Sequence, residues 1–341
     1  MTGGALMAAD MAAQPEVLRG LRGRRPSLVA GVRSLVAEPP RGVVIVARGS
    51  SDYAAVFGRY VIEAATGRPP ALAAPSLQTL YGVEPRLERW LAIAVSQSGR
   101  TPEIATVLEG FARAGARTVA VTNDAESPLA RAADATVALG AGEEGAVPAT
   151  KTFTASVGAF ALIAEALGRV PWDDAGWAAL PAAAEAVLAD PEPAERAAAA
   201  LAPADEVVCL ARGYLLCVAL EAALKLREAG GVRAEGWSSA DYRHGPVTVA
   251  GADLPVVACS AAGPAATDTE ALARELAERG TTVVRLCERP EADLPFPAAP
   301  PEPLAAIPAA VRAQQLALAV ALRRGRDPDR PAGLRKVTPT R

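Results

Sequence analysis

VVIVARG, residues 43–49, is followed 164 residues later by VVCLARG, residues 207–213. Each is a continuous apolar run that ends in the same three letters, which is typical of a parallel strand buried on both faces. A second pair, LAIAVSQSG at 91–99 and LPVVACSAAG at 254–263, lies at an offset of 163, and a third pair begins at Thr118 with an offset of 164. Three strand positions at nearly one offset predict an internal duplication.

Apolar strand-like runs alternate with helix-like segments on both sides of these stretches. In the first half we expect strands at 42–47, 91–95, 118–121 and 136–139, and helices at 52–65, 102–114, 128–133 and 152–167. This alternation predicts an α/β fold of two tandem doubly wound parallel sheets, each a flavodoxin-like three-layer sandwich.

The domain boundaries follow from shifts in composition. We expect a helical lead-in over 1–26, a first domain over 27–195, a second domain over 196–323 and a C-terminal tail over 324–341. The boundary between the two domains falls in a stretch rich in Ala, Pro and Glu, and the second domain ends in a long helix over 304–323.

Composition excludes several classes of protein. Of the 341 residues 51% are apolar, and the net charge is −3, so no broad basic surface for nucleic acid is expected. No apolar run reaches the length of a membrane helix, and the N-terminus lacks the order of a signal peptide. The cysteines, none of them at metal-ligand spacing, are expected to be reduced core residues of a cytoplasmic protein without a metal: Cys209, Cys217, Cys259 and Cys287.

Lysine and histidine are rare in this sequence. Among 35 basic residues only Lys151, Lys225 and Lys336 are lysines, and His244 is the single histidine. Arginine does not lose its proton, whereas lysine can act as a nucleophile and histidine titrates near neutral pH. Retention by chance explains one such residue, but all four lie in polar, glycine-containing or acid-bearing segments, so we treat them as candidate functional residues.

Polar side chains follow two of the predicted strands. Ser96, Gln97, Ser98 and Thr101 come after the strand at 91–95, just where a helix is expected to begin. Helix N-termini at the carboxyl edge of an open α/β sheet favour anions, and neutral hydroxyl donors suit a phosphate dianion. A simple helix cap needs one hydroxyl, whereas this loop offers three.

The first strand ends in a similar way, since Ser51 stands at the start of the next expected helix. The two loops are predicted to bind one phosphate together, although Ser51 alone could be a cap. Neither of these two loops contains a Walker motif or GxGxxG, which disfavours a nucleotide at this site.

One helix-like segment carries three charges on a single face. Lys225 lies four residues after Glu221 and three before Glu228. Spacing alone favours a surface ion-pair ladder. The polar segment that follows ends in a turn and holds His244, which favours a catalytic group.

These motifs together resemble the SIS (sugar isomerase) domain family, and specifically the isomerase half of glucosamine-6-phosphate synthase. The matching stretches are ARGSSDYAA, SQSGRTPE, GEEGAVPATKTFTAS, LEAALKLREAGGVRAEGWSSADYRHGP and DPDRPAGLRKVTPTR. Five motifs stand in the family order, and Glu228 and His244 have the family's separation of sixteen residues. The SQSGR and LRKVT wording is shared with the second type of glucosamine-6-phosphate deaminase.

The resemblance implies a role for individual residues. Glu228 matches the base that moves a proton between C1 and C2, Lys225 its assisting lysine, and His244 the ring-opening histidine. The family's histidine serves a neighbouring subunit, which implies a homodimer with shared active sites.

The remaining matches concern binding and the C-terminal tail. Lys336 matches a tail lysine that forms a Schiff base with the open-chain ketose, in a tail that closes the site. The family binds phosphate at Ser51, Ser96, Gln97, Ser98 and Thr101 and meets the sugar hydroxyls at Val147 and Ala149. No cofactor is implied.

Departures from the family decide between reactions. The amide-hydrolysing half is not in this sequence, Arg100 stands where synthases have an acid, and Ala149 replaces a serine. We therefore expect a deaminase that converts glucosamine 6-phosphate and water to fructose 6-phosphate and ammonia. The alternatives are a glutamine- or ammonia-dependent aminotransferase, with a separate glutaminase partner that nothing in the sequence supports, and a fructosamine-phosphate deglycase. A sugar-phosphate sensor would need the serine loops but not Lys225, Glu228 and His244 together.

Overall fold

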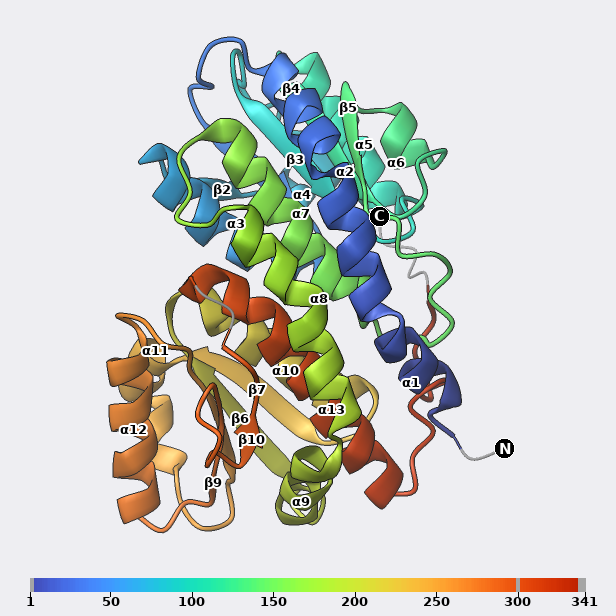
Figure 1. Cartoon of the computed structure of the whole chain (residues 1–341). Coiled ribbons are helices and arrows are strands. Elements are labelled where there is room, and N and C mark those ends of the chain that lie inside the picture. The colour runs from blue at the N-terminus through green and yellow to red at the C-terminus, as the bar shows by residue number, and fades with distance from the viewer. Residues whose placement is uncertain (1–2, 299–300, 337–341) are drawn as a thin grey trace. The chain divides into compact units, whose positions relative to one another are not determined.

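The computed structural model describes residues 3–298 and 301–336, and it contains two parallel five-stranded sheets (Figure 1). The first sheet has the order β2-β1-β3-β4-β5. Its strands are β1 (Val43–Val46), β2 (Ala71–Leu72), β3 (Leu91–Val95), β4 (Arg117–Thr122) and β5 (Ala135–Ala138). The second sheet, read in the matching direction, has the order β7-β6-β8-β9-β10. Its strands are β6 (Glu206–Ala211), β7 (Arg233–Ser238), β8 (Val256–Cys259), β9 (Val283–Cys287) and β10 (Leu294–Pro295).

The two sheets therefore have one topology, the flavodoxin-like order 2-1-3-4-5. Every strand pair is parallel, and Val43 of β1 pairs with Leu91 of β3 as Val208 of β6 pairs with Val256 of β8. The predicted α/β fold with two doubly wound sheets is confirmed, and so is the duplication.

Helices cover both faces of the first sheet. They are α3 (Ser50–Thr66), α4 (Pro75–Thr79), α5 (Pro102–Arg113), α6 (Pro128–Arg131) and α7 (Lys151–Leu167). On one face, Val44 and Val46 of β1 and Ala92 of β3 pack against Ile104 and Phe111 of α5. All four residues of β1 and all five of β3 are buried, which explains why these strands are apolar without alternation.

The second sheet lies between α11 and α12 on one side and α10 and α13 on the other (Figure 1). The helices after the first sheet are α8 (Asp174–Ala189), α9 (Glu192–Leu201), α10 (Leu216–Glu228), α11 (Ser239–Arg243), α12 (Ala266–Glu278) and α13 (Ala306–Arg323). Three short 3₁₀ helices are η1 (Gly213–Leu215), η2 (Pro246–Val249) and η3 (Glu302–Ala305). Leu272 and Leu276 of α12 lie four residues apart on one face and pack against Val208 of β6 and Val256 of β8.

Two N-terminal helices precede the first sheet, α1 (Ala5–Ala12) and α2 (Gln14–Leu35). The helix α2 continues through Pro26 and past residue 26, where the helical lead-in was expected to end. Arg24 donates to the carbonyl oxygens of Ala138 and Leu139, both at 2.9 Å, and so ties this helix to the end of β5.

The chain divides into two compact units that are discontinuous in sequence. Of the described residues, the first-sheet unit comprises 16–143, 152–171 and 335–336. The second-sheet unit comprises 3–15, 144–151, 172–298 and 301–334. The predicted domain ranges stay a prediction, and residues 337–341 of the predicted tail lie outside the described part of the chain.

One segment, Glu302–Arg323, is long and apolar enough to cross a membrane, contrary to the expectation from the sequence. Of its most apolar window, 89% is buried inside the protein. The helix α13 packs on α8, α9 and α10 of its own unit. Its apolar character is therefore that of a core helix, because it is covered by other helices on most sides.

Candidate active site

Helices α3 and α5, which follow β1 and β3, begin at the switch point of the first sheet. At a switch point, the connections that leave two neighbouring strands run in opposite directions along the sheet. The N-cap residues of α3 and α5, Gly49 and Thr101, make no side-chain capping hydrogen bond. By contrast, Ser127 caps α6 by accepting from the Ala130 amide. The hydroxyl of Thr101 is thus not used as a cap, which favours its role as a ligand donor over the simpler alternative.

The loop after β3 brings the predicted phosphate residues together. The Ser96 and Thr101 hydroxyls lie 3.2 Å apart, and the Ser98 hydroxyl accepts from the amide of Arg100 at 3.2 Å. Gln97 and Ser98 are half-buried, while Ser96 is buried at the end of its strand. Ser51 lies in the first turn of α3, at the neighbouring strand end.

Gly99 makes this loop possible. Its φ is 61°, a left-handed conformation that glycine adopts without strain. A Cβ at this position would lie 2.0 Å from the Ser127 hydroxyl oxygen. The loop therefore packs its backbone directly against the start of α6.

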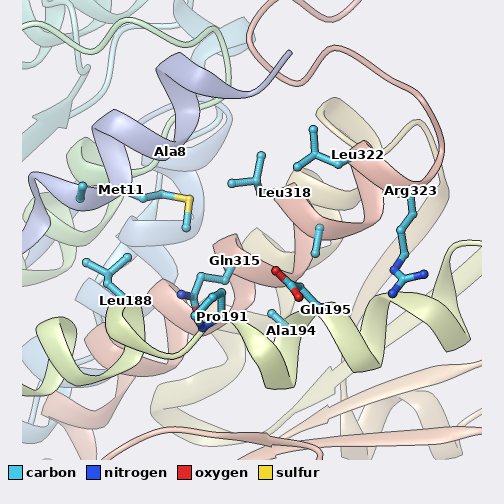
Figure 2. Close-up of a pocket in the computed structure, with 12 residues that line it drawn as sticks. Ala8, Met11, Leu188, Pro191, Ala194, Glu195, Gln315, Leu318, Leu322 and Arg323 are labelled. Carbon is cyan, nitrogen blue, oxygen red and sulfur yellow. The ribbon is translucent and has the colours of Figure 1, made fainter. Parts of the chain in front are cut away.

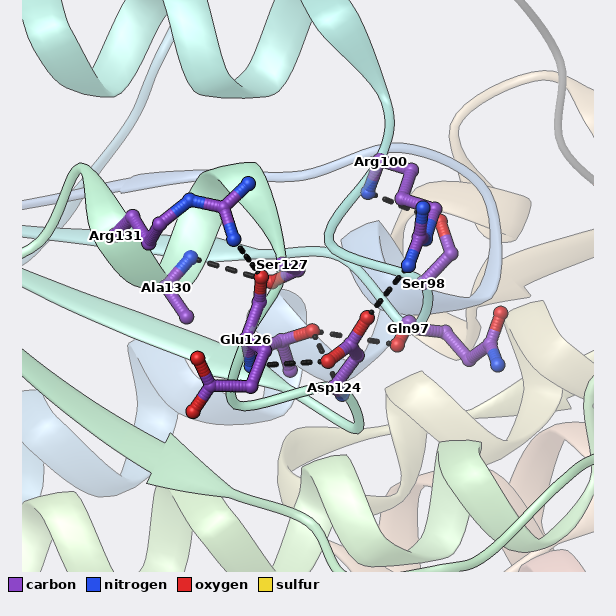
Figure 3. A network of polar contacts seen from close by, with 9 residues as sticks. Gln97, Ser98, Arg100, Asp124, Glu126, Ser127, Ala130 and Arg131 are labelled. Atoms are coloured by element: carbon purple, nitrogen blue, oxygen red, sulfur yellow. Dashed lines mark hydrogen bonds and ion pairs between the residues drawn. The ribbon is translucent and has the colours of Figure 1, made fainter.

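A polar network fixes the back of the loop, as Figure 3 shows. Arg100 donates to Asp124 at 3.0 Å, and the Glu126 amide donates to the other Asp124 oxygen at 2.9 Å. The hydrogen bond from the Glu126 amide and, to a lesser extent, the one from Arg100 lower the pKa of the Asp124 carboxyl. Exposed Arg100 is thus a partner of Asp124.

Removing the Thr101 hydroxyl should weaken phosphate binding. Thr101→Val keeps the β-branched shape, and a hydrogen bond to a charged group contributes about 1.5–3 kcal/mol. We expect kcat/KM for a phosphorylated substrate to fall about 10- to 100-fold, mainly through KM. The melting temperature should fall only slightly, because the buried Ser96 hydroxyl loses one partner. Steady-state kinetics measure this.

The matched control is Thr66→Val. Thr66 lies at the far end of α3, where its hydroxyl donates to the Ile62 carbonyl. An equal rise of KM in this control would show that the hydroxyl of Thr101 has no special role.

A buried lysine lies between two carboxylates on α10. The Lys225 amine is 3.3 Å from the Glu221 carboxylate and also forms a short ion pair with Glu228. The side chains of Lys225 and Glu221 are 1% and 2% exposed, whereas that of Glu228 is 19% exposed. The face predicted from i, i+3 and i+4 spacing is therefore buried and is not a surface ion-pair ladder, and only Glu228 reaches solvent.

Electrostatics keep Lys225 charged. Burial lowers the pKa of Lys225, but the carboxylates of Glu221 and Glu228 outweigh burial, so that its pKa lies above the ordinary value. Glu144 adds to the same effect from a neighbouring loop. A positive charge is thus held beside the Glu228 carboxylate.

The loop 144–151 carries the predicted sugar contacts Val147 and Ala149, both half-buried. Two backbone hydrogen bonds and one ion pair hold this loop. The Glu144 carboxylate accepts from the Thr150 amide at 2.8 Å, Asp10 accepts from the Ala146 amide at 2.9 Å, and Asp10 pairs with buried Lys151 at 2.9 Å. Lys151 is therefore a structural residue of this loop.

Asp329 joins the C-terminal tail to the same loop. Its carboxylate accepts from the amides of Gly4, Leu6 and Met7 at the start of α1, at 2.8–3.1 Å. Its carbonyl oxygen accepts from the Val147 amide at 3.0 Å. The tail, α1 and the loop thus support one another. Sequence reasoning missed Asp10, Glu144 and Asp329, although Glu144 and Asp329 lie inside the recognised stretches GEEGAVPATKTFTAS and DPDRPAGLRKVTPTR.

The remaining predicted residues lie apart from these contacts. His244 is exposed at the end of α11, where its amide donates to the Asp241 carbonyl. Lys336 is half-buried in the tail and is grouped with the first-sheet unit. The phosphate residues belong to that unit as well, whereas Lys225, Glu228, His244 and the loop 144–151 belong to the second-sheet unit.

A separate cavity of about 540 Å³ is lined by α1, by the connection from α8 to α9 and by α13 (Figure 2). Met11, Leu188 and Leu318 contribute apolar surface to it, and none of the predicted site residues lines it. It is therefore not the candidate active site. The four cysteines are free and buried, and no group of three metal-ligating side chains occurs among residues 3–298 and 301–336.

The fold is a duplicated, doubly wound α/β fold. In its first sheet, hydroxyl side chains stand at the ends of β1 and β3, and the helices that follow these strands have no side-chain cap. The chain belongs to the SIS domain family, whose model matches residues 39–166 and 200–322. The recognition made from the motifs is thereby confirmed.

Named relatives extend this result. The glutamine–fructose-6-phosphate aminotransferase (isomerizing) of Zymomonas mobilis subsp. mobilis is 33% identical over 86% of this chain and 51% of its own length. The Thermus thermophilus protein of the same name is 31% identical over 95% of this chain and 57% of its own. The chain thus spans about half the length of these curated relatives.

Two solved structures are similar along nearly their whole length. A candidate phosphosugar isomerase from Silicibacter pomeroyi DSS-3 has a TM-score of 0.87 and 33% identity, over 95% of this chain and 99% of that one. The glucosamine-6-phosphate deaminase of Thermotoga maritima has a TM-score of 0.74 at 22% identity, over 96% of this chain and 100% of the other. The second similarity concerns the fold alone.

Proposed function

We propose that the protein is a sugar-phosphate isomerase of the amino-sugar type, which converts glucosamine 6-phosphate and water to fructose 6-phosphate and ammonia. The observation that carries the proposal is the cluster on α10. There a partly exposed carboxylate, Glu228, is held beside a lysine that stays charged in the core. Such a pair provides a base together with a cation, as proton transfer next to a carbonyl requires.

The phosphate acts as a handle in this proposal. The loop after β3 and the start of α3 would bind it through backbone amides and the hydroxyls of Ser51, Ser98 and Thr101. Binding energy from this remote group then positions the reacting carbons. Val147 and Ala149, from a loop that Asp10, Glu144 and Asp329 hold rigid, would meet the sugar hydroxyls.

Proton transfer would follow ring opening by His244. Glu228 removes the proton from C2 of the open-chain aldose and returns it to C1, so that the C2 amine becomes a ketimine. Water adds to the ketimine, the C2–N bond breaks and ammonia leaves. Lys225 would stabilise the negative charge that develops on the C1 oxygen.

Shared active sites in a homodimer are part of the proposal. His244 is exposed at the end of a short helix, as a residue that serves a second subunit has to be.

A cytoplasmic location is consistent with four reduced cysteines.

A second reaction is favoured by the names of the relatives. Glutamine–fructose-6-phosphate aminotransferases match most of this chain with about half of their own length. The same residues could run the reverse isomerisation on fructose 6-phosphate, with ammonia from a separate partner.

One assay distinguishes the two reactions. The pure protein is incubated with glucosamine 6-phosphate, and separately with fructose 6-phosphate plus glutamine or ammonium. Ammonia release in the first mixture supports the deaminase. Product in the glutamine arm alone would contradict it, and no reaction in any arm would favour a sensor.

Lys336 should form a Schiff base with the open-chain ketose. Incubation with fructose 6-phosphate and borohydride is expected to add the reduced sugar to Lys336, which peptide mass spectrometry locates. Lys151 is the internal control, because its amine is buried in an ion pair with Asp10. Equal labelling of other amines, or an unlabelled Lys336, would rule out this step.

A further inference from the structure

The two sheets share glycines at their strand ends. The offset of 164 places Gly213 opposite Gly49, and Gly263 opposite Gly99. Gly49 and Gly213 both have a left-handed φ, 59° and 64°. Because the two sheets have one topology, the ends of β6 and β8 form the switch point of the second sheet, as the ends of β1 and β3 do in the first.

Most of the hydrogen-bonding side chains of the first switch point are missing from the second. Ser96 alone keeps a hydroxyl counterpart, Ser260. The other positions change from polar to apolar: Ser51 to Leu215, Gln97 to Ala261, Ser98 to Ala262 and Thr101 to Ala265. The glycine positions of the first switch point are thus retained without most of its polar side chains, and of Gly213 and Gly263 only Gly213 has a left-handed φ.

Carboxylates of the chain itself occupy the second switch point. The Ala262 amide donates to a Glu288 oxygen at 2.7 Å. A Cβ on Gly263 would lie 2.0 Å from one Glu302 oxygen, and a Cβ on Gly213 would lie 3.9 Å from the other. Glu302, at the start of η3, therefore reaches both the loop after β6 and the loop after β8.

The electrostatics agree with two anions in one place. Burial, and then the Glu288 carboxylate, raise the pKa of Glu302. Burial, and then Glu302, raise the pKa of Tyr214 in the loop after β6. The nearby cations have other partners, since Arg212 pairs with Asp268 and Arg289 pairs with Glu270.

We propose that Glu288 and Glu302 stand in for a bound anion and close the strand-end site of the second sheet to phosphorylated ligands, which leaves one phosphate site per chain. The chain's own carboxylates use the backbone positions that a phosphate would need, and they repel any external anion. The second sheet is then free to supply the residues of α10 without competing for the substrate's phosphate.

Opening this site tests the inference. The test starts from a Ser98→Asp variant, in which the added carboxylate prevents phosphate from binding at the loop after β3. Further replacement by Glu288→Ser and Glu302→Ser should create a site for about one inorganic phosphate per chain, at least about tenfold tighter than in the control. Calorimetric titration with phosphate at constant ionic strength measures affinity and stoichiometry.

The matched control is Ser98→Asp with Glu278→Ser and Glu291→Ser. It loses the same two charges at exposed positions of the same unit. The measured quantity is the difference in phosphate binding between the opened variant and this control. Because both carry Ser98→Asp, that difference does not depend on whether Ser98 itself binds phosphate. A folded variant that gains no site, or a control that gains as much, would overturn it.

Two further measurements keep the test decisive. If the Glu288 and Glu302 double replacement does not fold, as thermal unfolding by circular dichroism would show, Glu302→Ser alone in the same background replaces it, with the same two outcomes. The wild-type protein should bind one phosphate per chain. If the wild-type protein binds two phosphates per chain, the inference is overturned. If the wild-type protein binds no phosphate while the opened variant binds one, the result counts against the proposed function and not against the inference.

Discussion

Replacing Glu228 with glutamine is expected to reduce turnover by about 10²–10⁴-fold, because general acid–base catalysis usually contributes that much. The amide has nearly the shape of the carboxylate and can still accept from Lys225, but it cannot take a proton from C2. The affinity for glucosamine 6-phosphate should change little, since the phosphate residues lie on other elements. Stopped assays of ammonia release and equilibrium titration with the sugar phosphate measure the two effects separately.

The control for Glu228→Gln is Glu235→Gln. Glu235 lies on β7, where it accepts from the Trp237 ring nitrogen, in the same unit as α10. This variant should keep its turnover. A Glu228→Gln protein that retains more than about a tenth of wild-type turnover would reject the assignment of the base.

Mixing Glu228→Gln with His244→Ala protein tests the shared site. In a mixed dimer, one of the two sites combines an intact Glu228 with the partner's intact His244. Activity should therefore return on mixing and exceed the sum of the two variants. No recovery after subunit exchange would contradict a site built from two subunits.

Replacing Lys225 with methionine is expected to lower the free energy of unfolding by about 3–5 kcal/mol and to abolish activity. Methionine has a similar length but no charge, so that Glu221, 2% exposed, would remain as a buried carboxylate without its cation. Urea unfolding followed by circular dichroism measures the loss. The cost is high because a lone ion in the core is stabilised by neither water nor a counter-charge.

The double variant Glu221→Gln with Lys225→Met separates charge from packing. With both ions gone, at least about half of the lost stability should return, since a neutral pair carries no desolvation penalty for a lone charge. Activity should not return. Equal instability of the single and double variants would show that the loss comes from packing alone.

The pH dependence of this pair follows from the direction of the shift. The pKa of Lys225 is raised in the folded protein above its ordinary value of 10.5. The stability that it contributes is therefore fully present below that value, and it is lost only as the pH rises through the raised pKa. The difference in unfolding free energy between wild type and Lys225→Met should stay constant from neutral pH to about pH 10.

The main strands could be predicted because parallel strands covered on both faces need continuous apolar runs. The runs that begin at Val43, Leu91 and Val207 all became central strands. The edge strands β2 and β10, with two residues each, gave no such signal. Two residues in a strand contribute too little buried surface to leave a pattern.

The site was predictable in part. The serine loop and the Glu221, Lys225 and Glu228 spacing are local features, set by a strand end and by the helical repeat. The partners that hold the loop 144–151 are not local. Asp10 and Asp329 lie 136 and 182 residues from Ala146 and Val147, to which they are hydrogen-bonded.

The sequence by itself determined the duplication, the class of sheet, and which residue types stand at the strand ends, because these depend on short-range periodicity and residue chemistry. Only the tertiary structure decided that Lys225 is buried with a single carboxylate, Glu228, left at the surface. It alone also placed Glu288 and Glu302 at the second switch point. Burial and the meeting of distant charges depend on how the helices and loops of a unit pack together, and a linear pattern does not encode that packing.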